Sequence, residues 1–286
     1  MKRIVEKSFA KINIALNVLS KREDGFHELD MIMVPLKLHD SLAISRLQYK
    51  RDNFVIMDDF SFYIGDNNIA HKALDTMNAN YDLKGQKFKI IIHKNVPMQA
   101  GMGGGSSNAA ATLRGINKFC RLGISTDRLF ELSKPLGSDV PFFVYNTPAR
   151  CQGKGEIITP INIKNNYYVL IVKPEKGCST KTIFAEFDKN PNYKGCDIDK
   201  VVRALEEGND DLLVEAMNNS LQPYSVKLIP EIQTIIDSLK NDGLKIVQMT
   251  GSGSAVFALS TDKKLLKKLV RKYEDKYLVE LTEVLK

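Results

Sequence analysis

A glycine-rich stretch between an expected strand and an expected helix constrains this chain most. Residues 88–93 (Phe-Lys-Ile-Ile-Ile-His) are typical of a strand, because they include three β-branched isoleucines and partly alternate. Residues 101–107 (Gly-Met-Gly-Gly-Gly-Ser-Ser) hold four glycines and two serines, and an alanine-rich helical pattern follows from residue 108. Glycines permit positive φ angles and let a ligand approach the backbone closely. The order strand, glycine loop, helix therefore predicts a loop that is built around a ligand or a tight turn.

The beginning of the expected helix is a candidate anion site. Ser106 or Ser107 is the expected N-cap, because serine oxygens accept hydrogen bonds from the first amides of a helix. Those amides have no partner inside the helix, and they lie at the positive end of its dipole. Together they favour a bound phosphate. A purely structural turn is the alternative, since glycine loops alone give many false matches.

The stretch is neither of two common phosphate-binding motifs. No Lys-Ser or Lys-Thr pair follows the last glycine, Gly105, as a P-loop would require. Ser106 stands where the dinucleotide fingerprint needs its third glycine. The predicted phosphate cradle is therefore of another kind.

Length and composition indicate a globular protein of two domains. The chain has 286 residues, which is enough for two cores, and it carries a net charge of +7. We expect no membrane partner, because no apolar run approaches a bilayer span and the N-terminus is charged. The four cysteines form no CxxC pair, so we expect reduced thiols, a cytoplasmic location and no metal site. The lysines of 263–272 are interpreted as the solvated face of a helix.

Two polar residues share one face of the first expected strand. From 9 to 19, apolar residues alternate with polar or small ones, which places Lys11 and Asn13 on the same side. Taken alone, this pattern favours a half-exposed edge strand with solvated polar side chains. An Asp24-Gly25 turn leads to a second strand over 26–34.

The remaining patterns predict an α+β fold. Further strands are expected near 42–44 and 54–56, and an Asn-capped helix begins at 69. Residues 150–160 read as a hairpin, and the second half mixes strands with helices. The chain turns polar around 160–166, which gives expected domains 1–162 and 163–286.

Five short motifs in order resemble the GHMP kinase superfamily. Its glycine signature reads Pro, three residues, Gly-Leu-Gly-Ser/Gly-Ser/Gly-Ser-Ser, and residues 97–110 are similar to it. The other resemblances lie at 10–13, 24–27, 136–143 and 251–254, so the likeness covers about residues 4 to 259. It implies two α+β domains, the C-terminal one ferredoxin-like, with the active site in the cleft between them. It also implies ATP with Mg²⁺ as the donor, and a methylerythritol linked to cytidine diphosphate as the acceptor.

The resemblance also implies roles for individual residues. Lys11 and Asp139 would be the catalytic pair, with Asp139 as the base and Lys11 as its electrostatic partner. The ATP-binding set is Asn68, Pro97, Met98, Gln99, Ala100, Gly101, Met102, Gly103, Gly104, Gly105, Ser106 and Ser107. The acceptor-binding set is Asn13, Phe26, His27, Thr180, Phe184, Gly251, Ser252 and Gly253, with the cytosine held by Phe26 and His27 and closed off by Phe184.

Two positions depart from the family pattern. Met102 stands where leucine is usual, which is a modest change of packing. Phe26 stands where tyrosine is usual, so stacking survives while a hydroxyl contact is lost. Structural roles stay open for single residues: Asp139 as a helix cap, His27 as a core histidine and 251–254 as a plain hairpin turn.

Two alternative functions remain at this point. One is another GHMP kinase, acting on homoserine, mevalonate or a sugar, although Phe26 and His27 would then have no base to contact. The other is a basic RNA-binding protein, but no RNP aromatic pair or GxxG clamp stands out. We therefore expect a small-molecule substrate, no nucleic-acid partner, and a monomer or weak homodimer.

Overall fold

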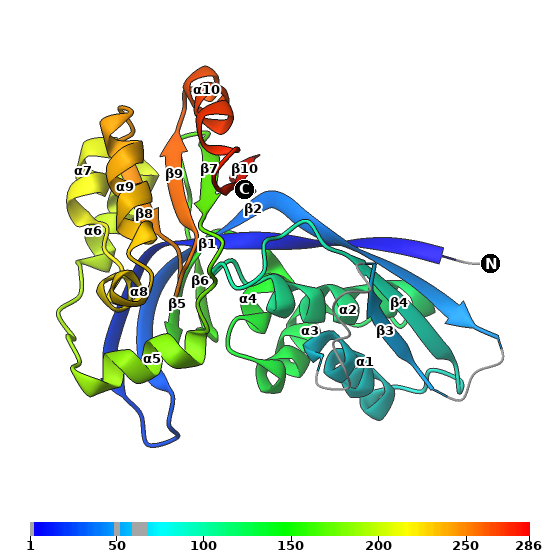
Figure 1. The fold of residues 1–286 in the computed structure, drawn as a ribbon. Coiled ribbons are helices and arrows are strands. Elements are labelled where there is room, and N and C mark those ends of the chain that lie inside the picture. Colours follow the sequence, from blue (N-terminus) through cyan, green and yellow to red (C-terminus); the bar gives the residue numbers. More distant parts are fainter. Residues whose placement is uncertain (1–2, 49–51, 59–67) are drawn as a thin grey trace. The chain divides into compact units, whose positions relative to one another are not determined.

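The computed structural model describes residues 3–48, 52–58 and 68–286, and the chain divides into two compact units. The first unit comprises Met1–Ala10, Leu38–Pro97 and Gly103–Asn146, and the second comprises Lys11–Lys37, Met98–Met102 and Thr147–Lys286. Two long strands, β1 (Arg3–Lys21) and β2 (His27–Leu47), contribute residues to both units (Figure 1). The glycine loop, residues 97–107, is likewise shared.

The first unit packs helices on strands. Residues 41–47 of β2 pair antiparallel with β4 (Lys87–His93), and β3 (Phe54–Met57) runs parallel to β4. Alternate residues of β4 are buried, as its sequence pattern predicts. The helices of this unit are α1 (Ile69–Asn80), α2 (Gly104–Cys120), α3 (Thr126–Ser133) and α4 (Val140–Tyr145), with a short 3₁₀ turn at Lys134–Leu136.

Small residues let α2 lie close to β2. A Cβ atom on Gly115 would come 2.3 Å from Cδ1 of Ile44, so no larger residue fits there without movement. Ala109, Ala110 and Ala111 are fully buried on the same helix. This close packing explains why the helix that follows the glycine loop is rich in alanine and glycine.

The second unit contains a four-stranded antiparallel sheet in the order β10-β7-β9-β8. Its strands are β7 (Tyr168–Lys173), β8 (Ile246–Met249), β9 (Val256–Ser260) and β10 (Leu278–Glu283). Residues 29–33 of β2 pair with β5 (Ala149–Gly153), which forms the expected hairpin with β6 (Ile157–Pro160). The predicted α+β class is confirmed.

Six helices accompany these strands. They are α5 (Thr180–Lys189), α6 (Ile198–Glu207), α7 (Asp210–Ala216), α8 (Gln222–Leu228), α9 (Glu231–Asn241) and α10 (Lys263–Tyr273). Neither α5 nor α8 is among the helices expected above. Helix α10 packs on β7 and β10 (Figure 1). Its lysines are exposed. Within the described ranges, every helix is too short or too polar to cross a bilayer.

Candidate active site

Two glycine turns of the second unit meet backbone to backbone. Gly101 has a φ of +72°, and a Cβ atom there would lie 2.1 Å from the carbonyl oxygen of Thr250. Gly251, with a φ of +57°, would place its Cβ atom 2.9 Å from the Gly101 carbonyl oxygen and 3.2 Å from Nζ of Lys11. Both positions therefore require glycine for close approach. The second glycine turn, residues 250–254, is more than the plain link between β8 and β9.

Three carbonyl oxygens of the glycine loop accept hydrogen bonds from other segments of the second unit. The carbonyls of Gln99, Ala100 and Met102 accept hydrogen bonds from the amides of Cys178, Ala255 and Lys11 at 3.3, 3.4 and 3.1 Å. Carbonyl oxygens would repel a phosphate, so their use in these bonds suits a loop that presents amides to an anion. The loop is fixed to β1 and to the second glycine turn by the same contacts.

Lys11 and Asn13 are buried, which corrects the expectation of a solvated edge strand. Their side chains are only 4% and 1% exposed. The amide of Asn13 donates to Oγ1 of Thr250 at 2.9 Å, and Nζ of Lys11 donates to Oδ1 of Asn13. The second glycine turn covers this face of β1, and a contact between such distant segments leaves no trace in the alternation of the strand itself.

Helix α2 begins at Gly104, before both serines, so the expected serine N-cap is wrong. Gly103 is the N-cap, with a φ of +69° and no side-chain cap, and the first intrahelical bond runs from the Ser107 amide to the Gly103 carbonyl oxygen at 2.9 Å. Glycine takes this left-handed conformation without the strain that serine would meet. The unpaired amides at the start of α2 therefore belong to residues 104–106.

The start of α2 fits an anionic ligand. Oγ of Ser107 is fully buried and has no hydrogen-bond partner among the described residues, a costly state unless a ligand completes it. A Cβ atom on Gly104 would lie 3.2 Å from Nζ of Lys94, so an ammonium group lies beside this helix start. Lys94 also pairs with the buried carboxylate of Asp40. Lys94 is not among the predicted site residues, and its only signal in the sequence is its place just after β4.

Asn68 lies at the start of α1, beside the start of α2. Its Oδ1 accepts from the Ala70 amide at 2.9 Å, so the expected Asn cap is confirmed. The side chain of the next residue, Ile69, lies close to two glycines. A Cβ atom on Gly105 would lie 3.9 Å from its Cγ2, and a Cβ atom on Gly137 would lie 3.2 Å from its Cδ1. The first unit thus gathers the beginnings of α1 and α2 and the turn before Asp139.

Asp139 occupies the N-cap position of α4 but does not act as a cap. Its side chain makes no cap hydrogen bond, and the residue is partly exposed. Pro141, near the start of α4, has no amide hydrogen to offer a cap. The cap interpretation of Asp139 is therefore wrong, and its carboxylate is available for another task.

Aromatic side chains gather around His27 in the second unit. The ring of Phe26 is 51% exposed, with Nζ of Lys154 4.8 Å from its centroid. His27 is buried, and its ring stacks on Phe184 with centroids 4.6 Å apart and an interplanar angle of 25°. Nε2 of His27 lies 2.7 Å from a carboxylate oxygen of Asp188. Three of the predicted acceptor residues are therefore close neighbours.

Helix α5 also contacts the second glycine turn. The hydroxyls of Thr180 and Ser252 lie 3.0 Å apart, and the Ser252 carbonyl oxygen accepts from Oγ of Ser225 at 2.9 Å. A Cβ atom on Gly253 would lie 2.7 Å from Sδ of Met249. The predicted residues Thr180, Ser252 and Gly253 are thereby held in one tightly packed corner.

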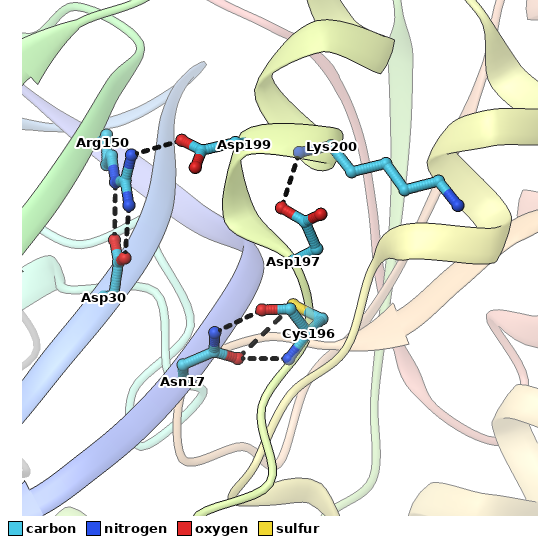
Figure 2. A network of polar contacts seen from close by, with 7 residues as sticks. All are labelled: Asn17, Asp30, Arg150, Cys196, Asp197, Asp199 and Lys200. Carbon is cyan, nitrogen blue, oxygen red and sulfur yellow. Dashed lines mark hydrogen bonds and ion pairs between the residues drawn. The ribbon is translucent and has the colours of Figure 1, made fainter.

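Polar contacts fix β1 and β2 where they carry site residues. Figure 2 shows the amide side chain of Asn17, which donates to the Cys196 carbonyl oxygen at 2.7 Å and accepts from the Cys196 amide at 2.9 Å. Arg150 binds both carboxylate oxygens of Asp30, at 2.8 and 2.6 Å, and one of Asp199 at 2.7 Å (Figure 2). These contacts lie on β1 beyond Asn13 and on β2 just beyond His27.

The predicted site residues fall into two sets, one in each unit. The first unit holds Asn68, Pro97, residues 103–107 and Asp139. The second unit holds Met98 to Met102, Lys11, Asn13, Phe26, His27, Thr180, Phe184 and residues 251–253. Within each unit, most of these residues contact one another or a shared neighbour.

Sequence profiles of one family match both halves of the chain. The profile of the GHMP kinases N terminal domain covers residues 68–147, and that of the GHMP kinases C terminal domain covers residues 201–279. A 4-diphosphocytidyl-2-C-methyl-D-erythritol kinase from Macrococcus caseolyticus is 33% identical over 93% of this chain and 94% of its own. The protein of the same name from Geobacillus kaustophilus is 38% identical over 90% of this chain and 88% of its own.

Solved structures agree with these matches. The crystal structure of a 4-(cytidine 5'-diphospho)-2C-methyl-D-erythritol kinase has a TM-score of 0.80 and 25% identity, and covers 98% of this chain and 99% of its own. A homoserine kinase from Cytophaga hutchinsonii has a TM-score of 0.74 at 16% identity, covering 100% of this chain and 95% of its own, and shares the fold. The glycine signature, the fold and the long matches all agree, and the chain belongs to the 4-diphosphocytidyl-2-C-methyl-D-erythritol kinases of the GHMP kinase family.

Proposed function

We propose that this kinase transfers the γ-phosphate of ATP to the 2-hydroxyl of 4-diphosphocytidyl-2-C-methyl-D-erythritol, a step of the methylerythritol phosphate route to isoprenoid precursors. The observation that carries the proposal is the contact of the glycine loop with the second glycine turn around the buried Lys11. Relatives named for this reaction match the chain over nine-tenths of its length, which supports the choice of acceptor.

ATP would be held by the glycine loop and the start of α2. The amides of residues 104–106, at the positive end of the helix, bind the donor phosphates. The buried hydroxyl of Ser107, which lacks a partner among the described residues, suits an additional phosphate or magnesium contact. Mg²⁺, when bound, neutralises charge on the phosphates. Asn68 would lie toward the adenine, and Pro97 to Ser107 would line the triphosphate.

We also propose a domain boundary near residue 162, which separates an N-terminal from a C-terminal kinase domain.

Asp139 would receive the proton of the acceptor hydroxyl. Phosphoryl transfer has a loose transition state, so catalysis depends on positioning and electrostatics more than on a strong base. A carboxylate then suffices, because the proton leaves late. Lys11 would be the electrostatic partner of Asp139 and stabilise negative charge on the transferred group. The proposal requires the Lys11 ammonium and the Asp139 carboxylate to converge on one hydroxyl.

The acceptor would lie along β1, β2 and α5. Phe26 offers an exposed ring for stacking on the cytosine, with His27 and Phe184 beside it. Asn13, Thr180 and the turn at 251–253 would contact the diphosphate and the sugar alcohol. Homoserine and mevalonate have no base for this aromatic cluster, so the cluster favours the cytidine-linked acceptor over those of the other GHMP kinases.

We also propose the partners, the oligomeric state and the location of the enzyme. Its partner is a small molecule, with no nucleic-acid or membrane partner, and it acts as a monomer or weak homodimer. A cytoplasmic location is supported by four cysteines that are all free thiols.

An acceptor panel tests the function. A coupled assay follows ADP release with ATP and one of three acceptors: the cytidine diphosphate-linked methylerythritol, mevalonate or homoserine. Turnover with the cytidine-linked acceptor alone is expected. Faster turnover of mevalonate or homoserine would assign the chain to another GHMP reaction, and RNA binding without any turnover would support the nucleic-acid alternative.

A further inference from the structure

We propose that Asp188 is a positioning residue that fixes the tautomer of His27, so that the acceptor site selects the amino group of cytosine over the carbonyl group of uracil. The inference rests on the proposed function, because it assigns base specificity within the proposed acceptor site. It concerns a residue of α5 that neither the glycine motifs nor the strand patterns single out.

The Asp188 carboxylate determines which nitrogen of His27 carries hydrogen. Its Oδ1 lies 2.7 Å from Nε2 of His27, and its Oδ2 lies 2.6 Å from Nζ of Lys21. The pKa of Asp188 is lowered: burial would raise it, but the hydrogen bonds from Lys21 and His27 outweigh burial. An ionised carboxylate only accepts hydrogen bonds, so Nε2 of His27 is the donor.

In the neutral imidazole, the other nitrogen of His27 is left as an acceptor. A neutral imidazole with hydrogen on Nε2 has a lone pair on Nδ1. Among the residues that the structure describes, none forms a hydrogen bond with this Nδ1. A lone pair attracts the exocyclic amine of cytosine, which donates hydrogen bonds. Uracil has a carbonyl oxygen at that position, and two facing lone pairs repel each other.

Aromatic packing holds the ring in this orientation. His27 stacks on Phe184 at 4.6 Å, and the ring of Phe187 meets it edge-on at 6.0 Å with an angle of 89°. The residues at 184, 187 and 188 share one face of α5, at helical spacings of three and four. His27 and Phe184 are already in stacking contact, so a base has no room between them and meets His27 at its edge. The exposed ring of Phe26, the preceding residue, supplies a stacking face.

The first test reads the tautomer directly. The wild-type kinase is labelled with ¹⁵N at histidine, and NMR correlates the ring nitrogens of His27 with its ring protons. We expect hydrogen on Nε2 and a bare Nδ1. Hydrogen on Nδ1, with Nε2 either bare or also protonated, would overturn the inference, whatever the variants show.

The second test measures base selectivity. The ratio of kcat/KM for the cytidine-linked acceptor to that for its uridine-linked analogue is compared between wild type and Asp188→Ala. We expect this ratio to fall about tenfold, the worth of one net hydrogen bond, with KM for ATP unchanged. Asp188→Asn, whose amide oxygen still accepts from Nε2, should keep most of the selectivity. Glu186→Ala is the matched control, because it removes a carboxylate of α5 that pairs only with Lys189 among its described neighbours.

The outcomes separate the inference from the proposed function. Equal wild-type rates with the cytidine- and uridine-linked acceptors would refute the inference alone. If Asp188→Ala lowers kcat/KM equally for both acceptors and for ATP, Asp188 has only a structural role, and the inference is also refuted. A wild-type enzyme that phosphorylates neither acceptor would refute the proposed function, and the inference would fail with it.

Discussion

The backbones of Gly101 and Gly251 touch: a Cβ atom on Gly251 would stand 2.9 Å from the carbonyl oxygen of Gly101. Within the second unit, residues 98–102 of the loop proposed to hold the donor phosphates thus contact the turn proposed to face the acceptor. Lys11 lies at the same point, because its Nζ would be 3.2 Å from that Cβ atom. Substitutions at this contact should therefore affect both substrates.

Gly101→Ala should cost more than left-handed strain alone. Its Cβ atom would overlap a backbone oxygen of Thr250 at 2.1 Å, so the loop or the turn must move. Gly243→Ala is the matched control: its φ is +91°, but a Cβ atom there meets nothing within 4 Å. We expect Gly243→Ala to lose about 1–2 kcal/mol with full activity. In denaturant unfolding, Gly101→Ala should lose more stability than Gly243→Ala. In initial-rate measurements, it should raise KM for both substrates. Equal losses would contradict the close contact.

Asp139→Asn should reduce kcat by about 10²–10⁴-fold while ATP binding persists, because the amide cannot receive a proton. Single-turnover rates and calorimetric titration with a non-hydrolysable ATP analogue measure the two effects. Glu131→Gln removes an exposed carboxylate of the same unit, which pairs with Lys134, and should leave both unchanged. Turnover by Asp139→Asn at the parental rate would show that another group takes the proton.

Phe26→Ala should weaken acceptor binding far more than ATP binding. Loss of one base-stacking contact is worth ~1–3 kcal/mol, so KM for the cytidine-linked acceptor should rise about 5- to 150-fold. Phe54→Ala removes an aromatic ring of the first unit that is 38% exposed, and provides the control. Initial-rate measurements with each substrate varied in turn give both constants. Equal changes in the two KM values would contradict a cytosine platform at Phe26.

The pairing of Asp242 should appear in the pH dependence of stability. Burial would raise its pKa, but hydrogen bonds from Lys272 and Tyr273 outweigh burial and hold the pKa below 3.8. Because the folded-state pKa is the lower one, this stabilisation is complete above 3.8 and is lost as the pH falls through the folded-state value. Asp242→Asn should therefore lower Tm at neutral pH by about 2 °C, and the difference should shrink in acid.

The exposed Asp275 provides the control for that prediction. It lies near the end of α10 and forms no ion pair within the described part of the chain. Asp275→Asn should leave Tm unchanged at every pH. If the Tm difference between Asp242→Asn and wild type stays constant down to pH 2, packing and not the charge of Asp242 determines its contribution to stability.

The features of the fold that depend on local pattern could be predicted from the sequence. Alternation in β1 correctly placed Lys11 and Asn13 on one face, and glycine content identified the loop before α2. The burial of that face could not be predicted, because it depends on a turn at the far end of the chain around Thr250. The start of α2 at Gly104 was missed because the left-handed Gly103 replaces a serine cap.

The parts of the site that escaped prediction depend on side-chain neighbours. Lys94 has no motif, and only packing shows it beside Gly104. Helix α5 did leave a signal, since the buried Ile183 and Phe187 are four residues apart. The partnership of His27 with Asp188 joins β2 to that helix, and no local pattern encodes it.

The central claim is phosphoryl transfer to one hydroxyl of one acceptor, and ³¹P NMR of the product tests it directly. The 2-carbon of the methylerythritol bears no hydrogen, so a phosphate on its oxygen gives a monoester signal without three-bond coupling to a proton. We predict that incubation with ATP and the cytidine-linked acceptor yields this uncoupled signal beside an intact diphosphate. A monoester signal split by neighbouring protons, or no new monoester, would contradict the account.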